Sequence, residues 1–169
     1  IPDFGVGKGI WLSVFHSISA FCNAGFDLLG STSIARYSGD WIICLTLMLL
    51  IIIGGLGFTV WDDIITNIKN KKKIHNLTLH TKLVLLITII LLISGTTFIF
   101  ILECDNMQTM NGDNLRTKIL KSAFQSTTLR TAGFYTMEQS ELTSVSKLIA
   151  VCMMFIGGSP VSTAGGIKT

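Results

Sequence analysis

Two short motifs hold the residues of this chain that are best suited to binding a cation. Residues 21–26 read Phe-Cys-Asn-Ala-Gly-Phe and residues 129–134 read Leu-Arg-Thr-Ala-Gly-Phe, so Ala-Gly-Phe recurs after 108 positions. Backbone carbonyls can replace the water shell of an ion without carrying a fixed charge. Turning several carbonyls inward requires unusual backbone angles, which glycine tolerates. Each motif therefore predicts a loop that lines a cation pathway, flanked by polar Asn23 or Thr131, with Phe26 and Phe134 packed behind it.

Arg130 stands next to the second of these loops and carries the wrong charge for lining a cation pathway. We expect its side chain to point away from the pathway and to bind carbonyl oxygens or a carboxylate, which would hold the loop in shape. The alternative is an arginine on the external surface, surrounded by water.

A short helix is predicted in front of each motif. Residues 8–22 and 115–129 both have a helical pattern, with Asn114 as the N-cap of the second, and both are too short to cross a bilayer. Such a helix can re-enter the membrane as a pore helix, and its partly negative C-terminal end would then face a cation. Amphipathic helices on the membrane surface have the same pattern and remain an alternative.

Three longer apolar runs and a low content of charged residues, 14%, predict an all-α integral membrane protein. Residues 41–61 are predicted to form one spanning helix of roughly 30 Å, with a tryptophan at each end as in interfacial belts. Residues 79–102 form a second spanning run. The third, residues 145–156, is too short to span, so it is either cut by the end of the chain or broken at Gly157 and Gly158.

The distribution of charge predicts how these helices are oriented. Lys69 and residues 71–73, all lysine, lie between the first two apolar runs, and the positive-inside rule places them in the cytoplasm. Residues 103–113 contain acidic side chains and neither lysine nor arginine, which fits an external loop. Residues 41–61 are therefore expected to run from outside to inside and residues 79–102 to run back.

The order of these segments indicates an internal repeat. A short helix, an Ala-Gly-Phe motif, an apolar helix and a glycine pair follow one another twice, the glycine pairs being residues 54–55 and 157–158. Internal repeats are common in transport proteins. The chain starts at Ile1 without a methionine and ends just after a Gly-rich segment. It is therefore expected to be a fragment holding the latter part of one unit and most of the next.

Other classes of function fit the sequence poorly. The Gly-rich C-terminal segment is superficially similar to a nucleotide-binding phosphate loop, but Ile167 separates Gly166 from Lys168 and no βαβ context precedes it. No enzyme and no organic cofactor is therefore predicted. The basic residues form no broad surface interleaved with aromatic residues, so nucleic-acid binding is not expected. The cysteines are scattered and are predicted to be small buried apolar residues rather than a metal site or disulfides: Cys22, Cys44, Cys104 and Cys152.

The chain resembles the Trk/Ktr/HKT superfamily of potassium transporters, and most closely its KtrB-type pore-forming subunit. The resemblance covers nearly the whole chain. The motifs that carry it are Phe-His-Ser-Ile-Ser-Ala-Phe at residues 15–21 before the first Ala-Gly-Phe motif, residues 128–134, residues 77–83, and the long Gly-rich segment 157–169.

The resemblance implies a pore of four repeated units in one polypeptide, each built as M1, pore helix, filter loop and M2. Residues 1–69 would be the pore helix, filter and M2 of the second repeat, residues 70–78 a cytoplasmic loop, and residues 79–169 the third repeat with a broken M2. It also implies a potassium filter lined by backbone carbonyls of Cys22, Asn23, Ala24, Gly25, Arg130, Thr131, Ala132 and Gly133. The implied intramembrane gating loop contains Gly157, Gly158, Ser159, Pro160, Ser162, Thr163, Ala164, Gly165, Gly166 and Lys168.

The same resemblance implies partners and a transported ion. It implies potassium uptake across the cytoplasmic membrane, often with sodium as the coupling ion, by a homodimer that sits on a cytosolic nucleotide-binding regulatory subunit. The family pattern has glycine where this chain has Val161, and a β-branched residue there would stiffen the gating loop. Two alternatives remain: a tetrameric potassium channel with one unit per chain, and a membrane scaffold that conducts no ions.

Overall fold

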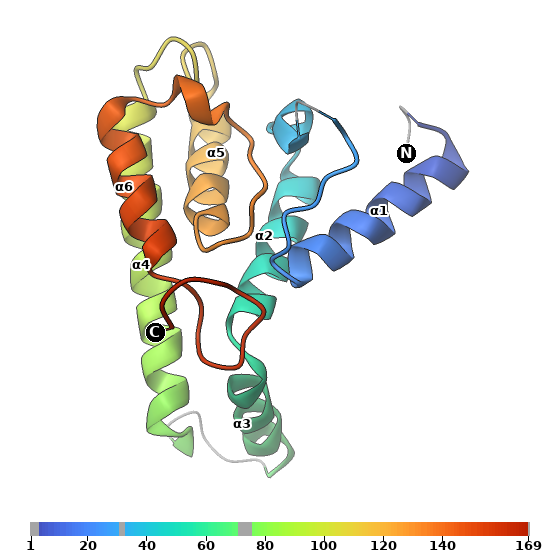
Figure 1. The fold of residues 1–169 in the computed structure, drawn as a ribbon, viewed down its shortest axis with the longest axis vertical. Helices are drawn as coiled ribbons and strands as arrows, with labels where there is room; N and C mark the ends of the chain where they lie inside the picture. The colour runs from blue at the N-terminus through green and yellow to red at the C-terminus, as the bar shows by residue number, and fades with distance from the viewer. Residues whose placement is uncertain (1–3, 31–32, 71–75, 169) are drawn as a thin grey trace.

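The computed structural model describes residues 4–30, 33–70 and 76–168, and consists of helices joined by loops (Figure 1). Within these ranges the only β pairing is an isolated parallel bridge between Ile156 and Ile167. The prediction of an all-helical chain is therefore confirmed for the described residues. The lysines at 71–73, which carry much of the predicted orientation, and Thr169 lie outside these ranges.

Six α-helices and two short 3-10 helices make up the described chain. The predicted short helices are confirmed as α1 and α5, whose ends differ from the predicted ends by no more than two residues. The α-helices are α1 (Val6–Phe21), α2 (Trp41–Gly55), α3 (Phe58–Lys69), α4 (Leu79–Glu103), α5 (Leu115–Thr128) and α6 (Ser144–Phe155), and the 3-10 helices are Ser33–Tyr37 and Gln139–Glu141.

The second apolar run forms α4, as predicted. It has 25 residues. Among the described residues it is the one unbroken helix long and apolar enough to cross a bilayer. Thr78 caps its N-terminus by accepting a hydrogen bond from the backbone N–H of Thr81. Asn114, at the N-cap of α5, makes no such side-chain bond.

The prediction of one spanning helix over residues 41–61 is wrong. The run is broken between α2 and α3, which meet at an angle of 95°. Gly57, at the break, has φ +84°, which a right-handed helix cannot contain. Trp61 therefore lies in α3, where its indole N–H donates to the carbonyl of Ile53 across the break (3.0 Å).

The third apolar run ends where the glycine pair predicted a break. Helix α6 stops at Phe155, and residues 156–168 continue as an irregular loop that lies beside the junction of α2 and α3 (Figure 1). We call residues 157–168 the C-terminal loop. Its two ends are held together, because the N–H of Gly157 donates to the carbonyl of Ile167 (3.0 Å) and the N–H of Ile167 donates to that of Phe155 (3.0 Å).

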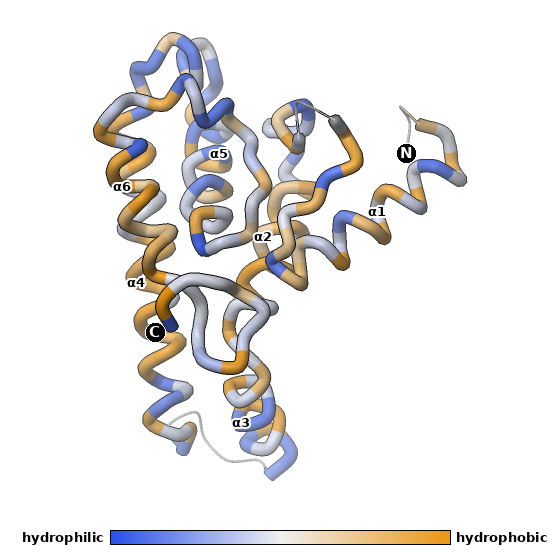
Figure 2. The backbone as a smooth tube through the Cα atoms, in the orientation of Figure 1, coloured by the Kyte–Doolittle hydropathy of each residue, from blue (hydrophilic) through white to orange (hydrophobic). Residues whose placement is uncertain are grey.

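The helices form two groups that meet where α2 contacts α5. Helix α1 packs on α2, and α4 packs on α3, α5 and α6. Of three clusters of buried apolar residues, the one between α1, α2 and α5 includes Cys44, Leu47, Phe124 and Phe134. Figure 2 shows that α4 consists mainly of apolar residues. Several of them are exposed, and Ile93 is 63% exposed. Such a surface fits contact with lipid or with further protein rather than with water.

The cysteines depart from the prediction that all four are buried. Cys44 is buried and Cys104 is partly exposed, whereas Cys22 and Cys152 are exposed, and all four are free thiols. Apolar residues of a membrane helix face outward as well as inward, so an apolar neighbourhood in sequence does not predict burial within the chain.

Candidate ion-pathway site

The two Ala-Gly-Phe loops, residues 22–25 and 130–133, meet face to face at their glycines. A Cβ atom added to Gly133 would lie 2.9 Å from Cα of Gly25. One added to Gly25 would lie 2.7 Å from the carbonyl oxygen of Ala132. Both glycines also have positive φ angles, +71° and +88°. Neither position can take a side chain without displacing the opposite loop.

The two loops also share a backbone geometry. Asn23 and Thr131 have φ angles of 49° and 68°, so each loop has a left-handed residue at its second position and a left-handed glycine two positions later. Left-handed residues other than glycine are uncommon and cluster at functional sites. The similarity of the loops therefore extends from sequence to conformation, although their second residues differ.

Backbone oxygens are available in both loops. Among the hydrogen bonds between described residues, none ends on the carbonyl oxygens of residues 22–25 or 130–133. A carbonyl oxygen without a hydrogen-bond donor is free to bind a cation. That these oxygens do so stays a prediction.

A hydroxyl group in the last turn of each short helix holds the end of the loop that follows it. Ser19 of α1 donates to the carbonyl of Phe26 (2.8 Å), and Thr128 of α5 donates to the carbonyl of Phe134 (2.5 Å). Phe134 is 1% exposed and packs behind its loop, as predicted. For Phe26 the same prediction is wrong, because its ring is 69% exposed and borders an apolar groove along α1 that includes Trp11.

The C-terminal loop is hydrogen-bonded to both Ala-Gly-Phe motifs, residues 21–26 and 129–134. Thr163 accepts from the side-chain amide of Asn23 (2.8 Å) and donates to the carbonyl of Phe21 (3.0 Å). The N–H of Gly165 donates to the hydroxyl of Thr131 (2.8 Å). The structure thus brings the three predicted site segments together, although Asn23 and Thr163 are 140 positions apart.

The C-terminal loop is hydrogen-bonded to the break between α2 and α3. The N–H of Ser159 donates to the carbonyl of Gly55 (3.1 Å), its hydroxyl donates to the carbonyl of Leu56, and the N–H of Phe58 donates to the carbonyl of Val161 (3.1 Å). Residues 54–58 were not among the predicted site residues. The available signal was Gly-Gly-Leu-Gly at residues 54–57, which was interpreted only as a marker of the repeat.

Arg130 is buried and bound to the C-terminal loop. Its side chain is 5% exposed, and its guanidinium donates to the carbonyl of Gly157 (3.5 Å). The interpretation that Arg130 binds a carbonyl is confirmed, and the water-exposed alternative is wrong. On the far side of the C-terminal loop, the ammonium of Lys168 donates to the carbonyl of Ala164.

Val161 occupies a strained position in the C-terminal loop, since its φ angle is 58°. A β-branched residue in the left-handed region costs roughly 1–2 kcal/mol. We expect Val161→Gly to stabilise the folded full-length protein by about 1 kcal/mol, after the larger unfolded-state entropy of glycine is subtracted. Thermal unfolding would measure this. Val151→Gly, at an exposed position inside α6, is the matched control and should destabilise. Equal destabilisation by the two changes would contradict the assignment of strain.

Comparison with known proteins adds independent information. Residues 4–169 match the family described as "TrkH: Cation transport protein". The chain is 41% identical over 169 residues to the potassium/sodium uptake protein NtpJ of Enterococcus hirae, matching 100% of this chain and 36% of that protein. It is 40% identical over 168 residues to the Ktr system potassium uptake protein B of Vibrio alginolyticus, matching 99% of this chain and 36% of the relative.

The fold has a counterpart among solved structures. The potassium transporter TrkH from Vibrio parahaemolyticus superposes with a TM-score of 0.73 at 20% identity, over 94% of this chain and 32% of that one. The chain therefore spans about a third of the length of the proteins it matches.

Proposed function

Because the chain belongs to the TrkH family of cation transport proteins, we propose that it supplies two filter loops and a gate to a potassium pathway across the cell membrane. Residues 22–25 and 130–133 would coordinate the ion through backbone carbonyls, and residues 157–168 would gate it. The observation that carries this proposal is the pair of facing loops whose eight carbonyls are left unpaired by the described chain. Carbonyl rings are the usual ligands of potassium filters.

The polarity of the site supports a cation rather than an anion. The side chains of the two loops include one charged group, Arg130, and it is directed to the carbonyl of Gly157. The carbonyl ends of α1 and α5 lead directly into the loops, and helix C-termini are partly negative. The names of the relatives, which include potassium or potassium/sodium uptake, favour potassium as the ion.

We further propose that residues 1–69 and 79–169 belong to two successive repeats, joined by a cytoplasmic loop at residues 70–78. The support is the common order of short helix, left-handed loop and interrupted apolar helix, with α4 as the M1 helix that precedes α5. In this scheme α6 and the C-terminal loop are the broken M2 of the later repeat. Since the chain spans about a third of its relatives, the complete pore needs the remaining units.

The proposed assembly follows from the family. The whole protein would be a multi-pass protein of the cell membrane, would form a homodimer and would bind a cytosolic nucleotide-binding regulatory subunit, with sodium as a coupling ion. Chemical cross-linking of the full-length protein in membranes, with and without the regulatory subunit, tests both contacts. Recovery of monomers alone would remove the dimer from this scheme.

Potassium uptake by the full-length parent protein tests the function itself. The host is a cell that lacks its own potassium-uptake systems, and the regulatory subunit is co-expressed. Growth at low potassium together with measured potassium influx is expected. Absence of influx from a well-expressed protein would leave a non-conducting membrane scaffold as the better description.

Thr163 is expected to hold the gate closed. Thr163→Val removes both hydrogen bonds of its hydroxyl to the first filter motif while keeping the size of the side chain. Two neutral hydrogen bonds contribute about 1–3 kcal/mol, so potassium influx should rise several-fold under conditions in which the wild-type gate is closed. Ser162→Ala is the matched control, because the Ser162 hydroxyl has no hydrogen-bond partner among the described residues. Unchanged or lower influx through the well-expressed Thr163 variant would contradict the proposal that Thr163 holds the gate closed.

A further inference from the structure

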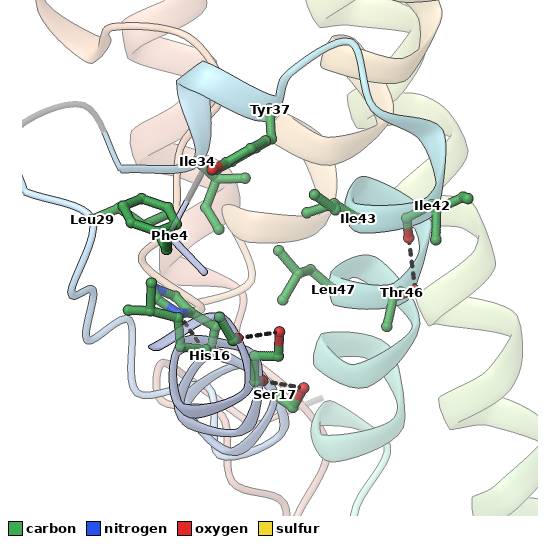
Figure 3. Close-up of a pocket in the computed structure, with 13 residues that line it drawn as sticks. Phe4, His16, Ser17, Leu29, Ile34, Tyr37, Ile42, Ile43, Thr46 and Leu47 are labelled. Carbon is green, nitrogen blue, oxygen red and sulfur yellow. Dashed lines mark hydrogen bonds between the residues drawn. The ribbon is translucent and has the colours of Figure 1, made fainter. Parts of the chain in front are cut away.

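His16 is a buried histidine on α1, beside a cavity of about 220 Å³ that Leu29, Tyr37 and Leu47 also line (Figure 3). Its Nδ1 atom lies 2.7 Å from the carbonyl oxygen of Leu12, and its Nε2 atom lies 3.1 Å from Oδ1 of Asp27. Carbonyl and carboxylate oxygens accept hydrogen bonds and do not donate them, so both ring nitrogens must carry a proton to satisfy these contacts. The geometry is that of an imidazolium paired with a carboxylate.

The structure also contains a partner for the neutral ring. The backbone N–H of Leu28 lies 3.4 Å from Nε2 of His16. A ring protonated on Nδ1 alone keeps its bond to Leu12 and can accept from Leu28, but its Nε2 lone pair then faces the carboxylate of Asp27. Loss of one proton therefore replaces an attraction by a repulsion at the turn formed by residues 27–28. Histidine is the side chain that ordinarily changes charge between about pH 5 and pH 8.

Asp27 remains the charged partner throughout that range. Burial would raise the pKa of its carboxyl group, but hydrogen bonds from Ser33, from the backbone N–H of Leu29 and from His16 outweigh this, so the pKa lies below its ordinary value. A carboxyl group with a lowered pKa stays ionised around neutral pH. The carboxylate of Asp27 therefore faces the imidazole of His16 as a fixed negative charge.

The pair is connected to both filter motifs. Asp27 follows Gly25 by two positions, and the intervening Phe26 has its carbonyl bound to Ser19 one turn along α1 from His16. On its other side the imidazole faces the ring of Phe134, with the ring centroids 6.2 Å apart. A movement of the 27–28 turn would therefore be transmitted to the exit of the first loop and to the residue that follows the second.

The later repeat, residues 79–169, has no counterpart of this pair. The positions 108 residues later are Phe124, which is fully buried, and Tyr135. The same place behind a filter loop can thus be filled by aromatic side chains, without an imidazole and a carboxylate. The later repeat therefore folds without a charged pair at these positions. We infer that the pair behind the first loop serves function rather than folding.

We propose that His16 and Asp27 form a proton-dependent brace behind the first filter loop, and that this brace makes potassium binding by the loop sensitive to pH. Protonation of His16 fixes the loop, and deprotonation loosens it and weakens potassium binding. The proposal rests on the function proposed above. Among the described residues that contact or surround the ring, from α1, the 27–29 turn, the Ser33–Tyr37 helix, α2 and Phe134, Asp27 is the only charged one and Tyr37 the only other titratable one.

The test is potassium flux through the full-length parent protein, with its regulatory subunit, in liposomes at clamped voltage. The wild-type KM for potassium should rise about fivefold between roughly pH 5.5 and pH 8.5, the factor that accompanies loss of one modest interaction. The double variant His16→Phe/Asp27→Tyr, which copies Phe124 and Tyr135 of the later repeat, should lose this pH dependence. His16→Gln, which can still donate to Asp27 but cannot titrate, should lose it too.

Each outcome decides between the two proposals. A wild-type KM that does not vary with pH, or variants that keep the wild-type profile, would overturn the brace while leaving the transport function intact. No flux at any pH would overturn the transport function and the brace with it. If the variants do not reach the membrane, nitrogen NMR of histidine-labelled wild type decides: two protonated ring nitrogens on His16 at the acidic end support the brace, and a neutral ring there contradicts it.

Discussion

Replacing Gly133 with Ser in the full-length parent protein is expected to abolish selective potassium uptake. A side chain at this position would begin 2.9 Å from Cα of Gly25, and φ of +88° is unfavourable for any residue with a Cβ atom. The two loops would have to separate, and the carbonyl geometry on both sides would change together. Because each ligand contributes to replacing the water shell of the ion, we expect loss of growth at low potassium or entry of sodium.

The matched control for this change is Gly39→Ser. An added Cβ at Gly39 meets no atom within 4 Å, and its φ angle is not in the left-handed region. Influx of potassium and sodium is measured for both variants and for wild type, after their amounts in the membrane are shown to be equal. Wild-type uptake and selectivity in the Gly133 variant would remove residues 130–133 from the pathway.

Replacing Glu103 with Gln is expected to cost the folded protein about 3 kcal/mol of stability. The carboxylate is fully buried, and four hydrogen bonds end on it. One oxygen accepts from Asn106 (2.7 Å) and Thr109 (2.8 Å), and the other accepts from both the N–H (3.0 Å) and the hydroxyl (2.8 Å) of Thr143. Every partner donates a hydrogen bond to the carboxylate. In the glutamine variant, the side-chain NH2 group would replace one carboxylate oxygen, so its N–H bonds would point at other donors.

Thr143 is the N-cap of α6, so this substitution also loosens the helix that leads into the C-terminal loop. Denaturation of the full-length protein in lipid nanodiscs measures the effect. Glu141→Gln is the matched control, because Glu141 is an exposed glutamate near the same helix and should change stability by less than about 0.5 kcal/mol. Equal stability of the two variants would show that the buried carboxylate contributes little to the fold.

Local sequence patterns were sufficient for the elements whose limits are set by nearby residues. The extents of α1, α4 and α5, and the end of α6 before Gly157, follow from apolar length, periodicity and glycine. The conformation of the loops at residues 22–25 and 130–133 could also be anticipated. Two copies of Ala-Gly-Phe after a short helix predicted unusual backbone angles, and the structure has left-handed residues at matching positions of both loops.

The break between α2 and α3 could not be located from the same patterns, because its partners lie far along the chain. Residues 41–61 are apolar with few interruptions, and length alone favours one helix. The carbonyls of Gly55 and Leu56 at the break are satisfied by Ser159, 103 positions after Leu56. A helix end that is capped by a distant segment leaves only a weak local signal, here the glycines at 54–57.

The burial of Phe26 and Phe134 could not be predicted from local sequence either. Both follow Ala-Gly, yet one is exposed and the other is buried in the core between α1, α2 and α5. Burial depends on what surrounds the loop in space, and the surroundings of the two motifs differ. For the same reason the contacts of Thr163, Glu103 and His16 could not be derived from residue types and spacing. The predicted orientation in the membrane stays a prediction.

The most direct measurement is the position of a heavy potassium analogue in the full-length protein. Crystals of the parent protein grown in rubidium or thallium salts would reveal the bound ion by its anomalous scattering. We expect peaks within coordination distance of the carbonyl oxygens of residues 22–25 and 130–133. Peaks only elsewhere, in a protein that transports potassium, would contradict the assignment of these loops as the filter.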